Sequence, residues 1–174
     1  MCNQKVLHNL IVPSCGYPPL CQVTTARMRE AFYLIMFQKL DAPFLCFPQA
    51  NGLGKKCQAH WIKNFYLEQS VTTMSLNQTW GTWDDTLRSV AEAEKFAKEN
   101  CFDTVHHYLV SDPTQLWRMW LICKCNGIEN IHRVSVYNSG RPWRDIFPHE
   151  VYSYGKVFLK GSRVLLKRIW EYLN

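Results

Sequence analysis

Two arginines and several short polar turns are the residues of this sequence best suited to hold an anion. The turns at Cys15-Gly16 and Ser111-Asp112 each follow an apolar run and precede a segment with helical spacing. Helix N-termini present unpaired N–H groups and a partial positive charge, so such turns can bind phosphate or carboxylate groups. Arg27 and Arg118 lie near the starts of two expected helices, and a guanidinium group grips these anions with a fork of donors. The predicted chemistry is therefore anion binding.

The same residue types also have ordinary structural roles. Ser and Asp are preferred N-caps, and we favour capping for Asp85, although Asp85 and Asp112 are also placed to bind ribose hydroxyls or to act as a base. A lone arginine most often forms a surface salt bridge, and glycine is common in any sharp turn. Capping and anion binding both stay open for these turns. No Ser, His and Asp set has the readable spacing of a catalytic triad.

The sequence lacks the motifs of the common cofactor enzymes. Residues 52–56, Gly-Leu-Gly-Lys-Lys, suggest a phosphate loop, but Gln49 stands where the Walker pattern needs glycine and Lys56 where it needs Ser or Thr. There is no Gly-x-Gly-x-x-Gly stretch. Common NAD and nucleoside-triphosphate enzymes are therefore poor candidates.

Eight cysteines and six histidines raise the question of disulfides and metals. The only close cysteine pair in the sequence is Cys123 and Cys125, which would lie on nearly opposite faces of a helix. His106 and His107 are neighbours in an expected strand, so their side chains should point to opposite faces. Without a secretory signal, we expect scattered free thiols, no disulfide and no metal site.

The spacing of apolar residues predicts the elements that position these groups. Strands are expected at residues 8–12, 44–47, 105–110 and 131–137, with a short one within 71–82. Helices are expected at 26–40, 57–69, 86–100, 114–125 and 150–173, with a polar loop at 138–148. Thr24 or Thr25 should cap the first helix, and Asp84 or Asp85 the third.

This alternation predicts a single α/β domain over residues 1–174, a three-layer α/β/α Rossmann-like fold with a mainly parallel sheet of about five strands. Residues 8–12 and 105–110 are apolar on both faces, which places them near the centre of the sheet. Ligands bind such sheets at the carboxyl ends of the strands. The loops at 13–17, 48–54, 82–86 and 111–115 should therefore meet at one edge.

The segments around these loops resemble those of a known family. In order and spacing, the chain from about residue 8 to 167 resembles the YdcF/SanA/ElyC-like family of bacterial domains. The matching segments are Leu10–Gly16, Arg27–Ala31, Phe44–Gly52, Asp85–Ala93 and Val110–Arg118, followed by Trp143 and Glu150. The family's strand running into Thr-Ser-x-x-His-x-x-Arg reads here as Val110–Arg118. Two departures are the loss of most glycines in the first two turns and the presence of Gln115 where the family has His.

The resemblance implies a pocket at the carboxyl edge of the sheet and a link to the bacterial cell envelope. Arg118 and Gln115 join the candidates because they stand within its last motif. The complete set of predicted ligand-binding residues is Ser14, Gly16, Arg27, Asn51, Gly52, Asp85, Thr86, Ser111, Asp112, Gln115, Arg118 and Glu150. We expect eight of them to share one cleft: Ser14, Gly16, Asn51, Gly52, Thr86, Ser111, Gln115 and Arg118.

The composition is that of a globular protein, and its positive charge either favours anionic partners or only aids solubility. Apolar residues make up 47% and charged residues 20%, and 20 Lys and Arg outweigh 14 Asp and Glu to give a net charge of +6. The longest apolar stretches fall well short of the roughly 20 residues that cross a bilayer, and the N-terminus lacks an apolar signal region. We therefore expect a cytoplasmic protein without a transmembrane segment.

Basic and apolar residues alternate from Lys156 to Tyr172. We expect an amphipathic helix that docks on the domain, because such helices are ordinary in globular proteins. The side chains expected to be buried are Val157, Phe158, Val164, Leu165, Ile169 and Trp170. The alternative is peripheral contact of this helix with an acidic membrane surface.

Three functions follow from these observations. The first is the binding of an anionic or nucleotide-like small molecule, such as S-adenosylmethionine or a phosphate-bearing metabolite, at the sheet edge. The second is a non-catalytic interaction or regulatory domain, which the lost glycines and Gln115 favour. The third is nucleic-acid binding through the basic surface, which ranks last because no nucleic-acid motif is present. The residues do not specify a reaction.

Overall fold

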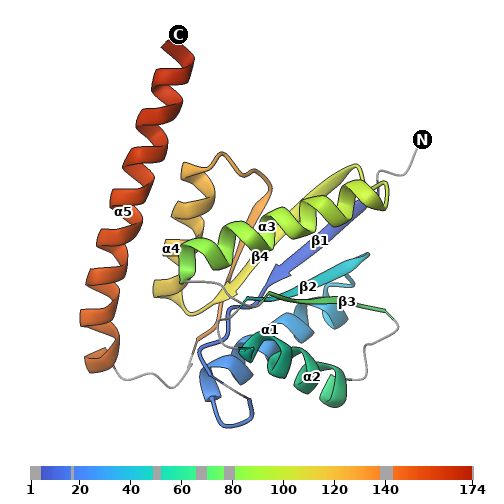
Figure 1. Ribbon diagram of the computed structural model, residues 1–174. Helices are drawn as coiled ribbons and strands as arrows, with labels where there is room; N and C mark the ends of the chain where they lie inside the picture. Colours follow the sequence, from blue (N-terminus) through green and yellow to red (C-terminus); the bar gives the residue numbers. More distant parts are fainter. Residues whose placement is uncertain are drawn as a thin grey trace.

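The computed structural model of the chain describes residues 5–16, 18–48, 52–65, 70–76, 81–137 and 143–173. Five strands form one sheet in the order β3-β2-β1-β4-β5, and every pair of neighbours is parallel (Figure 1). The strands are β1 (Val6–Ile11), β2 (Pro43–Pro48), β3 (Thr72–Leu76), β4 (Thr104–Ser111) and β5 (Ile131–Ser135). The predicted parallel sheet is confirmed, with β1 at its centre and β4 beside it.

Helices cover both faces of this sheet (Figure 1). Helices α1 (Gln22–Phe37) and α2 (Leu53–Phe65) pack on one face, and α3 (Thr82–Glu99) and α4 (Pro113–Cys125) pack on the other. Helix α5 (Trp143–Leu173) lies against α4 and extends past it. The chain therefore has the three-layer α/β/α Rossmann-like fold that the alternation of elements predicts. None of the helices in these ranges is long and apolar enough to cross a bilayer.

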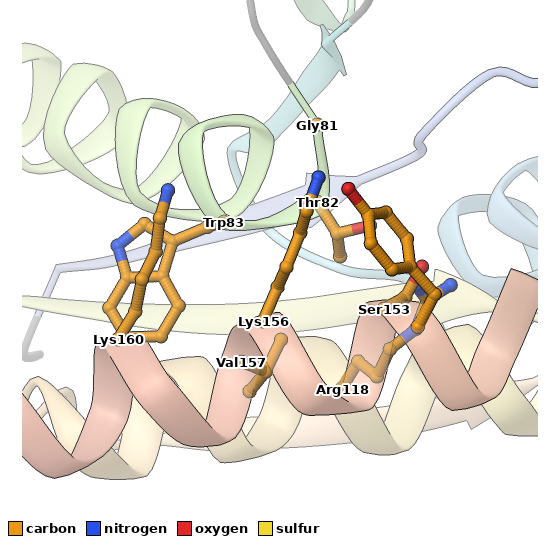
Figure 2. Close-up of a pocket in the computed structure, with 9 residues that line it drawn as sticks. Gly81, Thr82, Trp83, Arg118, Ser153, Lys156, Val157 and Lys160 are labelled. Carbon is orange, nitrogen blue, oxygen red and sulfur yellow. The ribbon is translucent and has the colours of Figure 1, made fainter.

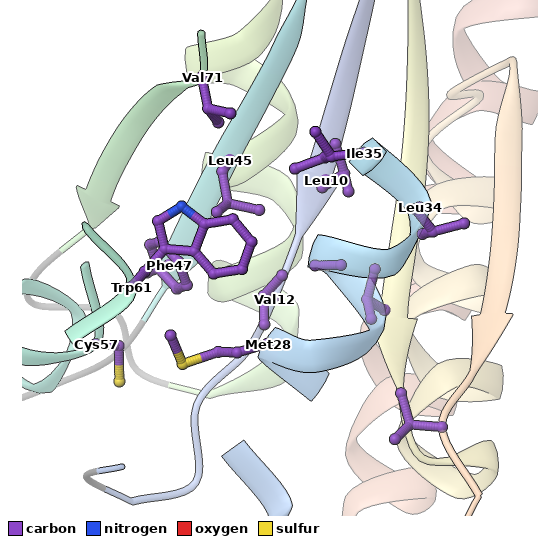
Figure 3. Packing of buried hydrophobic residues seen from close by; sticks show 13 residues of the cluster. Leu10, Val12, Met28, Leu34, Ile35, Leu45, Phe47, Cys57, Trp61 and Val71 are labelled. Carbon is purple, nitrogen blue, oxygen red and sulfur yellow. The ribbon is translucent and has the colours of Figure 1, made fainter. Parts of the chain in front are cut away.

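The larger core lies between the sheet and helices α1 and α2 (Figure 3). Trp61 of α2 is fully buried there, and its ring packs 4.6 Å from the ring of Phe65 and 6.4 Å from that of Phe47. All six residues of β2 are buried, which is typical of a strand covered by helices on both faces. A smaller cluster around Leu109 and Met119 joins the sheet to α3 and α4.

Three helices begin one turn earlier than their apolar spacing predicts. Helix α1 begins at Gln22 with Cys21 as its N-cap residue, so the prediction of a Thr24 or Thr25 cap was wrong. Helix α3 follows Gly81, so Asp84 and Asp85 lie in its first turn and do not cap it. The first turns of α1 and α3 are mostly polar, and hydrophobic periodicity becomes visible only after them.

Helix α5 departs most from its prediction. It begins at Trp143, so the expected loop at 138–148 is helical from residue 143 onward. Pro148 lies early in this helix, where a proline removes only one backbone hydrogen bond and does not have to end the helix.

The expected burial of the apolar side of α5 was also wrong. Of the six side chains predicted to dock, only Val157 is buried, whereas Phe158 is 75% exposed and Trp170 69% exposed. Helix α4 contacts another side of α5, where a Cβ on Gly161 would stand 3.1 Å from Cys125 Sγ and Arg168 Nη2 donates 2.6 Å to Asn126 O. The helix therefore docks through a side that includes Val157, Gly161 and Arg168 and leaves most of its apolar side chains exposed.

Candidate functional site

The strand order places a reversal of direction between β1 and β4. From β1 the chain winds through α1 towards β2 and β3, and it then returns through α3 to β4 on the other side of β1. In open parallel sheets, the crevice at such a switch point, outside the carboxyl ends of the strands, is the usual ligand site.

In this protein a buried ion pair fills the switch point. Arg27 of α1 is fully buried and donates to the Pro13 carbonyl after β1 and to the Asp112 carboxylate after β4. Its Nη2 also donates to Gln115 Oε1 at 2.8 Å. These four residues join the carboxyl ends of the two central strands through side chains that are far apart in sequence.

Asp112 is both the partner of Arg27 and the N-cap of α4. Its Oδ1 accepts hydrogen bonds from Thr114 Oγ1 at 2.8 Å and from the Gln115 N–H at 3.2 Å. Burial acts to raise the pKa of this carboxyl group, but the charge of Arg27 and these hydrogen bonds outweigh it and hold the pKa below 3.8. The carboxylate is therefore ionised at neutral pH and compensates the buried guanidinium.

The backbone N–H groups of the turn after β1 are likewise hydrogen-bonded within the protein. The N–H groups of Cys15 and Gly16 donate to Thr24 Oγ1 at 3.0 and 3.3 Å. Ser14 is buried, and Gly16 has no room for a side chain because a Cβ there would lie 2.9 Å from Cys21 Cβ. These N–H groups have an acceptor within the fold, so this turn presents no vacant anion cradle.

The remaining predicted residues lie at the same edge in separate places. Thr86 Oγ1 donates 2.7 Å to Thr82 O, and Asp85 is buried in the first turn of α3. Ser111 is buried at the end of β4, where its carbonyl accepts from the Val136 N–H at 2.9 Å. Gly52 precedes α2 with a φ of +72°, which favours glycine. Asn51 and the side chain of Glu150 lie outside the described residues.

A small cavity lies beside this edge, between the start of α3, α4 and α5 (Figure 2). Its volume is about 180 Å³. The side chains and backbone that line it are those of Gly81, Thr82, Trp83, Arg118, Tyr152, Ser153, Lys156, Val157 and Lys160. Among the predicted ligand-binding residues that the structure describes, Arg118 is the one that lines this cavity. Of the eight residues expected to share one cleft, Gln115 lies in the filled switch point and Arg118 lines this pocket.

The pocket is strongly cationic for its size. Arg118 is only 4% exposed, and its guanidinium carbon lies 5.9 Å from the centre of the Tyr154 ring. Lys156 Nζ lies 4.2 Å from the Tyr152 ring centre, and Lys160 Nζ lies 5.8 Å from the Trp83 ring centre. None of the described residues that line the pocket is acidic. Three positively charged side chains therefore surround one space beside the first turn of α3, which itself carries Asp84 and Asp85.

Sequence reasoning found Arg118 but missed the residues opposite to it. Lys156 and Lys160 are four residues apart and therefore share one face of α5, a spacing that was readable in the sequence. No local pattern shows that this side of α5 lies beside the start of α3. Trp83 was missed because the helix was expected to begin after it.

No protein-family model matches the chain, and no curated protein and no solved structure matches it either. The fold and the pocket thus define the class to which the chain belongs: a Rossmann-like α/β protein whose switch point is closed by an ion pair, with a cationic pocket beside it.

Proposed function

We propose that this protein binds a small phosphate-bearing ligand in the pocket between α3, α4 and α5. The observation that carries the proposal is the convergence of Arg118, Lys156 and Lys160 on a space that no described acidic residue lines. A buried arginine and two exposed lysines that line one space offer charged donors that favour phosphate oxygens. The proposal puts the anionic ligand that the sequence predicts in this pocket.

The dimensions of the pocket restrict the ligand further. At about 180 Å³ the pocket is smaller than the roughly 300–1,000 Å³ that encloses a drug-sized molecule, so it suits a phosphate head group. The remainder of a larger ligand would extend outward, where the Trp83 ring offers a surface for stacking a base. S-adenosylmethionine suits the site less well, because its sulfonium and ammonium groups would face three cations.

Removing the two lysines is expected to weaken phosphate binding by about 10- to 100-fold, the scale of one or two charge-assisted hydrogen bonds. Calorimetric titration of the Lys156→Ala/Lys160→Ala variant with pyrophosphate and with a nucleoside diphosphate measures this effect. Arg163→Ala is the matched control, since Arg163 is an exposed cation of the same helix that does not line the pocket.

Two results would contradict the proposal. One is an unchanged dissociation constant in the double variant, and the other is an equal loss of affinity in Arg163→Ala, which would indicate non-specific attraction. Trp83→Leu tests whether a base stacks on this ring. If it does, the variant should lose affinity for the nucleoside diphosphate but not for pyrophosphate.

We further propose peripheral contact of α5 with an anionic membrane as a second function. The supporting observation is the open apolar face of this helix, where Phe158, Leu166 and Trp170 are each at least 66% exposed. Lys167 and Arg163 are exposed on the same helix and would lie near lipid phosphates. A helix with an apolar face and lysine- or arginine-rich flanks commonly lies in the membrane interface.

Replacing three exposed side chains tests this second function. Phe158→Ser/Leu166→Ser/Trp170→Ser is expected to abolish sedimentation with vesicles that contain phosphatidylserine, while the melting temperature changes little because these side chains are exposed. Binding of the unaltered protein should also fall with added salt. The unaltered protein could instead fail to sediment with such vesicles and elute as a dimer that the triple variant does not form. In that case a second copy of the chain covers this face, and the membrane proposal fails.

A further inference from the structure

Two cysteines that are separated in the sequence lie in contact beside the switch point. Cys15 follows β1 and Cys21 is the N-cap residue of α1, and their Sγ atoms are 2.9 Å apart. Both are free thiols, Cys15 exposed and Cys21 half-buried. A disulfide bond joins sulfurs at about 2.0 Å, so closing this pair requires a movement of only about 1 Å.

The surrounding residues are built to allow this approach. A Cβ on Gly16 would lie 2.9 Å from Cys21 Cβ and 3.2 Å from Cys21 Sγ, so only glycine lets the turn pass this close. Thr24 Oγ1 contacts both sulfurs, at 3.8 Å from Cys15 and 3.5 Å from Cys21, and it also holds the Cys15 N–H. The thiols are thus positioned by several contacts from both ends of the turn.

The two thiols differ in their readiness to ionise. Burial acts to raise the pKa of Cys21, but hydrogen bonding by Cys15 and Thr24 and the N–H groups of Thr24 and Val23 outweigh burial and lower it. These N–H groups face the sulfur without forming a well-aligned capping hydrogen bond. Burial and the hydrogen bond to Cys21 raise the pKa of Cys15. Cys21 is therefore the better nucleophile at neutral pH, and Cys15 would react in a second step.

The other described cysteines provide a contrast. Cys46, Cys57 and Cys123 are fully buried, and burial raises the pKa of each thiol. Cys101 is exposed but has no cysteine beside it among the described residues. In the part of the chain that is described, no three His, Cys, Asp or Glu side chains cluster in a way that could hold a metal, which disfavours a zinc site for this pair.

We propose that Cys15 and Cys21 form a redox-active dithiol that exchanges with low-molecular-weight disulfides. The inference does not depend on the phosphate pocket. In the first step the Cys21 thiolate attacks one sulfur of a disulfide such as oxidised glutathione, which releases one glutathione thiolate that takes a proton from water. Cys15 then loses its proton to water and attacks Cys21 Sγ, which releases the second glutathione. Two protein thiols are oxidised and one small disulfide is reduced to two thiols.

The expectation that all thiols stay free was based on the lack of a secretory signal, and spacing in the sequence did not bring this pair together. A ring closed between residues 15 and 21 would tie the end of β1 to the start of α1. Both elements carry groups of the Arg27 network, since Pro13 and Arg27 flank the pair.

Glutathione buffers and thiol mapping test the proposal on the full-length protein. After equilibration at a series of ratios of reduced to oxidised glutathione, free thiols are alkylated and peptides are mapped by mass spectrometry. We expect a Cys15–Cys21 disulfide to accumulate as the buffer becomes more oxidising, and Cys101 to carry at most a mixed disulfide. In Cys15→Ser, Cys21 should be trapped as a mixed disulfide with glutathione. In Cys21→Ser, the internal disulfide should be lost entirely.

A rate measurement supplies a second criterion. At pH 7, alkylation of reduced Cys21 should be several-fold faster than that of Cys101, because its thiolate fraction is larger. Cys101→Ser is the control variant and should form the Cys15–Cys21 disulfide normally. The proposal is overturned if both thiols remain fully alkylated in the most oxidising buffer, or if either cysteine pairs with Cys57 or Cys101 instead.

Discussion

Replacing Asp112 with asparagine is expected to lower the free energy of unfolding by about 3–5 kcal/mol at pH 7, the usual effect of removing one partner of a buried ion pair. Asparagine is itself a good N-cap, so the substitution keeps the start of α4 and removes mainly the charge. Arg27 would then be a fully buried cation without its counter-ion. Urea denaturation followed by fluorescence measures the change.

Two controls separate the ion pair from general effects. Asp41→Asn removes an exposed carboxylate and should change stability by less than about 0.5 kcal/mol. Arg27→Met/Asp112→Asn removes both charges, and its cost should be smaller than the sum of the single variants because no unpaired charge stays buried. If Asp112→Asn is no more harmful than Asp41→Asn, then Pro13 and Gln115 satisfy Arg27 by themselves.

The pH dependence of this pair follows from the lowered pKa of Asp112. Because the folded protein binds the proton less readily than the unfolded chain, the pair contributes its full stability above pH 3.8, the ordinary pKa of the carboxyl group. The contribution is lost as the pH falls through the lower pKa of the folded state. The contribution of Asp112 to the free energy of unfolding therefore changes little with pH above pH 4.

Acidification from pH 7 to pH 4 is expected to reduce stability by about 3 kcal/mol through His107 alone. This histidine of β4 is 2% exposed, and burial together with repulsion from His106 and His132 lowers its pKa from 6.5 to about 4. The unfolded chain takes up a proton below pH 6.5, while the folded protein resists protonation until about pH 4. Stability is therefore lost between these values, at about 1.4 kcal/mol per pH unit.

The contacts of His107 explain why the neutral ring is favoured. Its Nδ1 lies 3.0 Å from Asn9 Nδ2, an amide donor that also reaches the Ser89 carbonyl at 3.3 Å. Protonation at Nδ1 would bring two donors face to face. Glu94 lies 4.0 Å from Nε2, but its side chain is 57% exposed, so water screens its attraction and burial dominates.

A substitution that cannot titrate isolates this effect. In His107→Asn an amide oxygen can accept from Asn9, and the loss of stability between pH 6.5 and pH 4 should shrink by about 3 kcal/mol relative to the unaltered protein. His60→Asn, which replaces a half-exposed histidine, is the comparison variant. Denaturation curves at pH 7, 6, 5 and 4 provide the comparison. Parallel profiles for all three proteins would show that His107 is not the titrating group.

The sequence predicted part of what the structure shows for His107 and for Asp112. Adjacent residues of a strand point to opposite faces, so the sequence predicted that His106 and His107 lie on opposite faces of the sheet. This prediction is confirmed. His107 contacts Asn9 on the α3 side, whereas His106 stacks on His132. Asp112 was recognised as a capping candidate, and it does cap α4. Its pairing with Arg27, 85 residues away, depends on how two crossovers bring α1 and β4 together, and no local pattern carries that information.

The sequence by itself determined the order of the elements, the parallel sheet and the central position of β1 and β4, because periodicity and alternation are local properties that reflect burial. It also located the edge where the polar residues gather. Only the tertiary structure decided that the switch point is filled by Arg27 and that Lys156 and Lys160 line the same pocket as Arg118. The same holds for the contact between Cys15 and Cys21. These outcomes depend on the angle of α5 and the path of a turn, which are set by packing between residues distant in sequence.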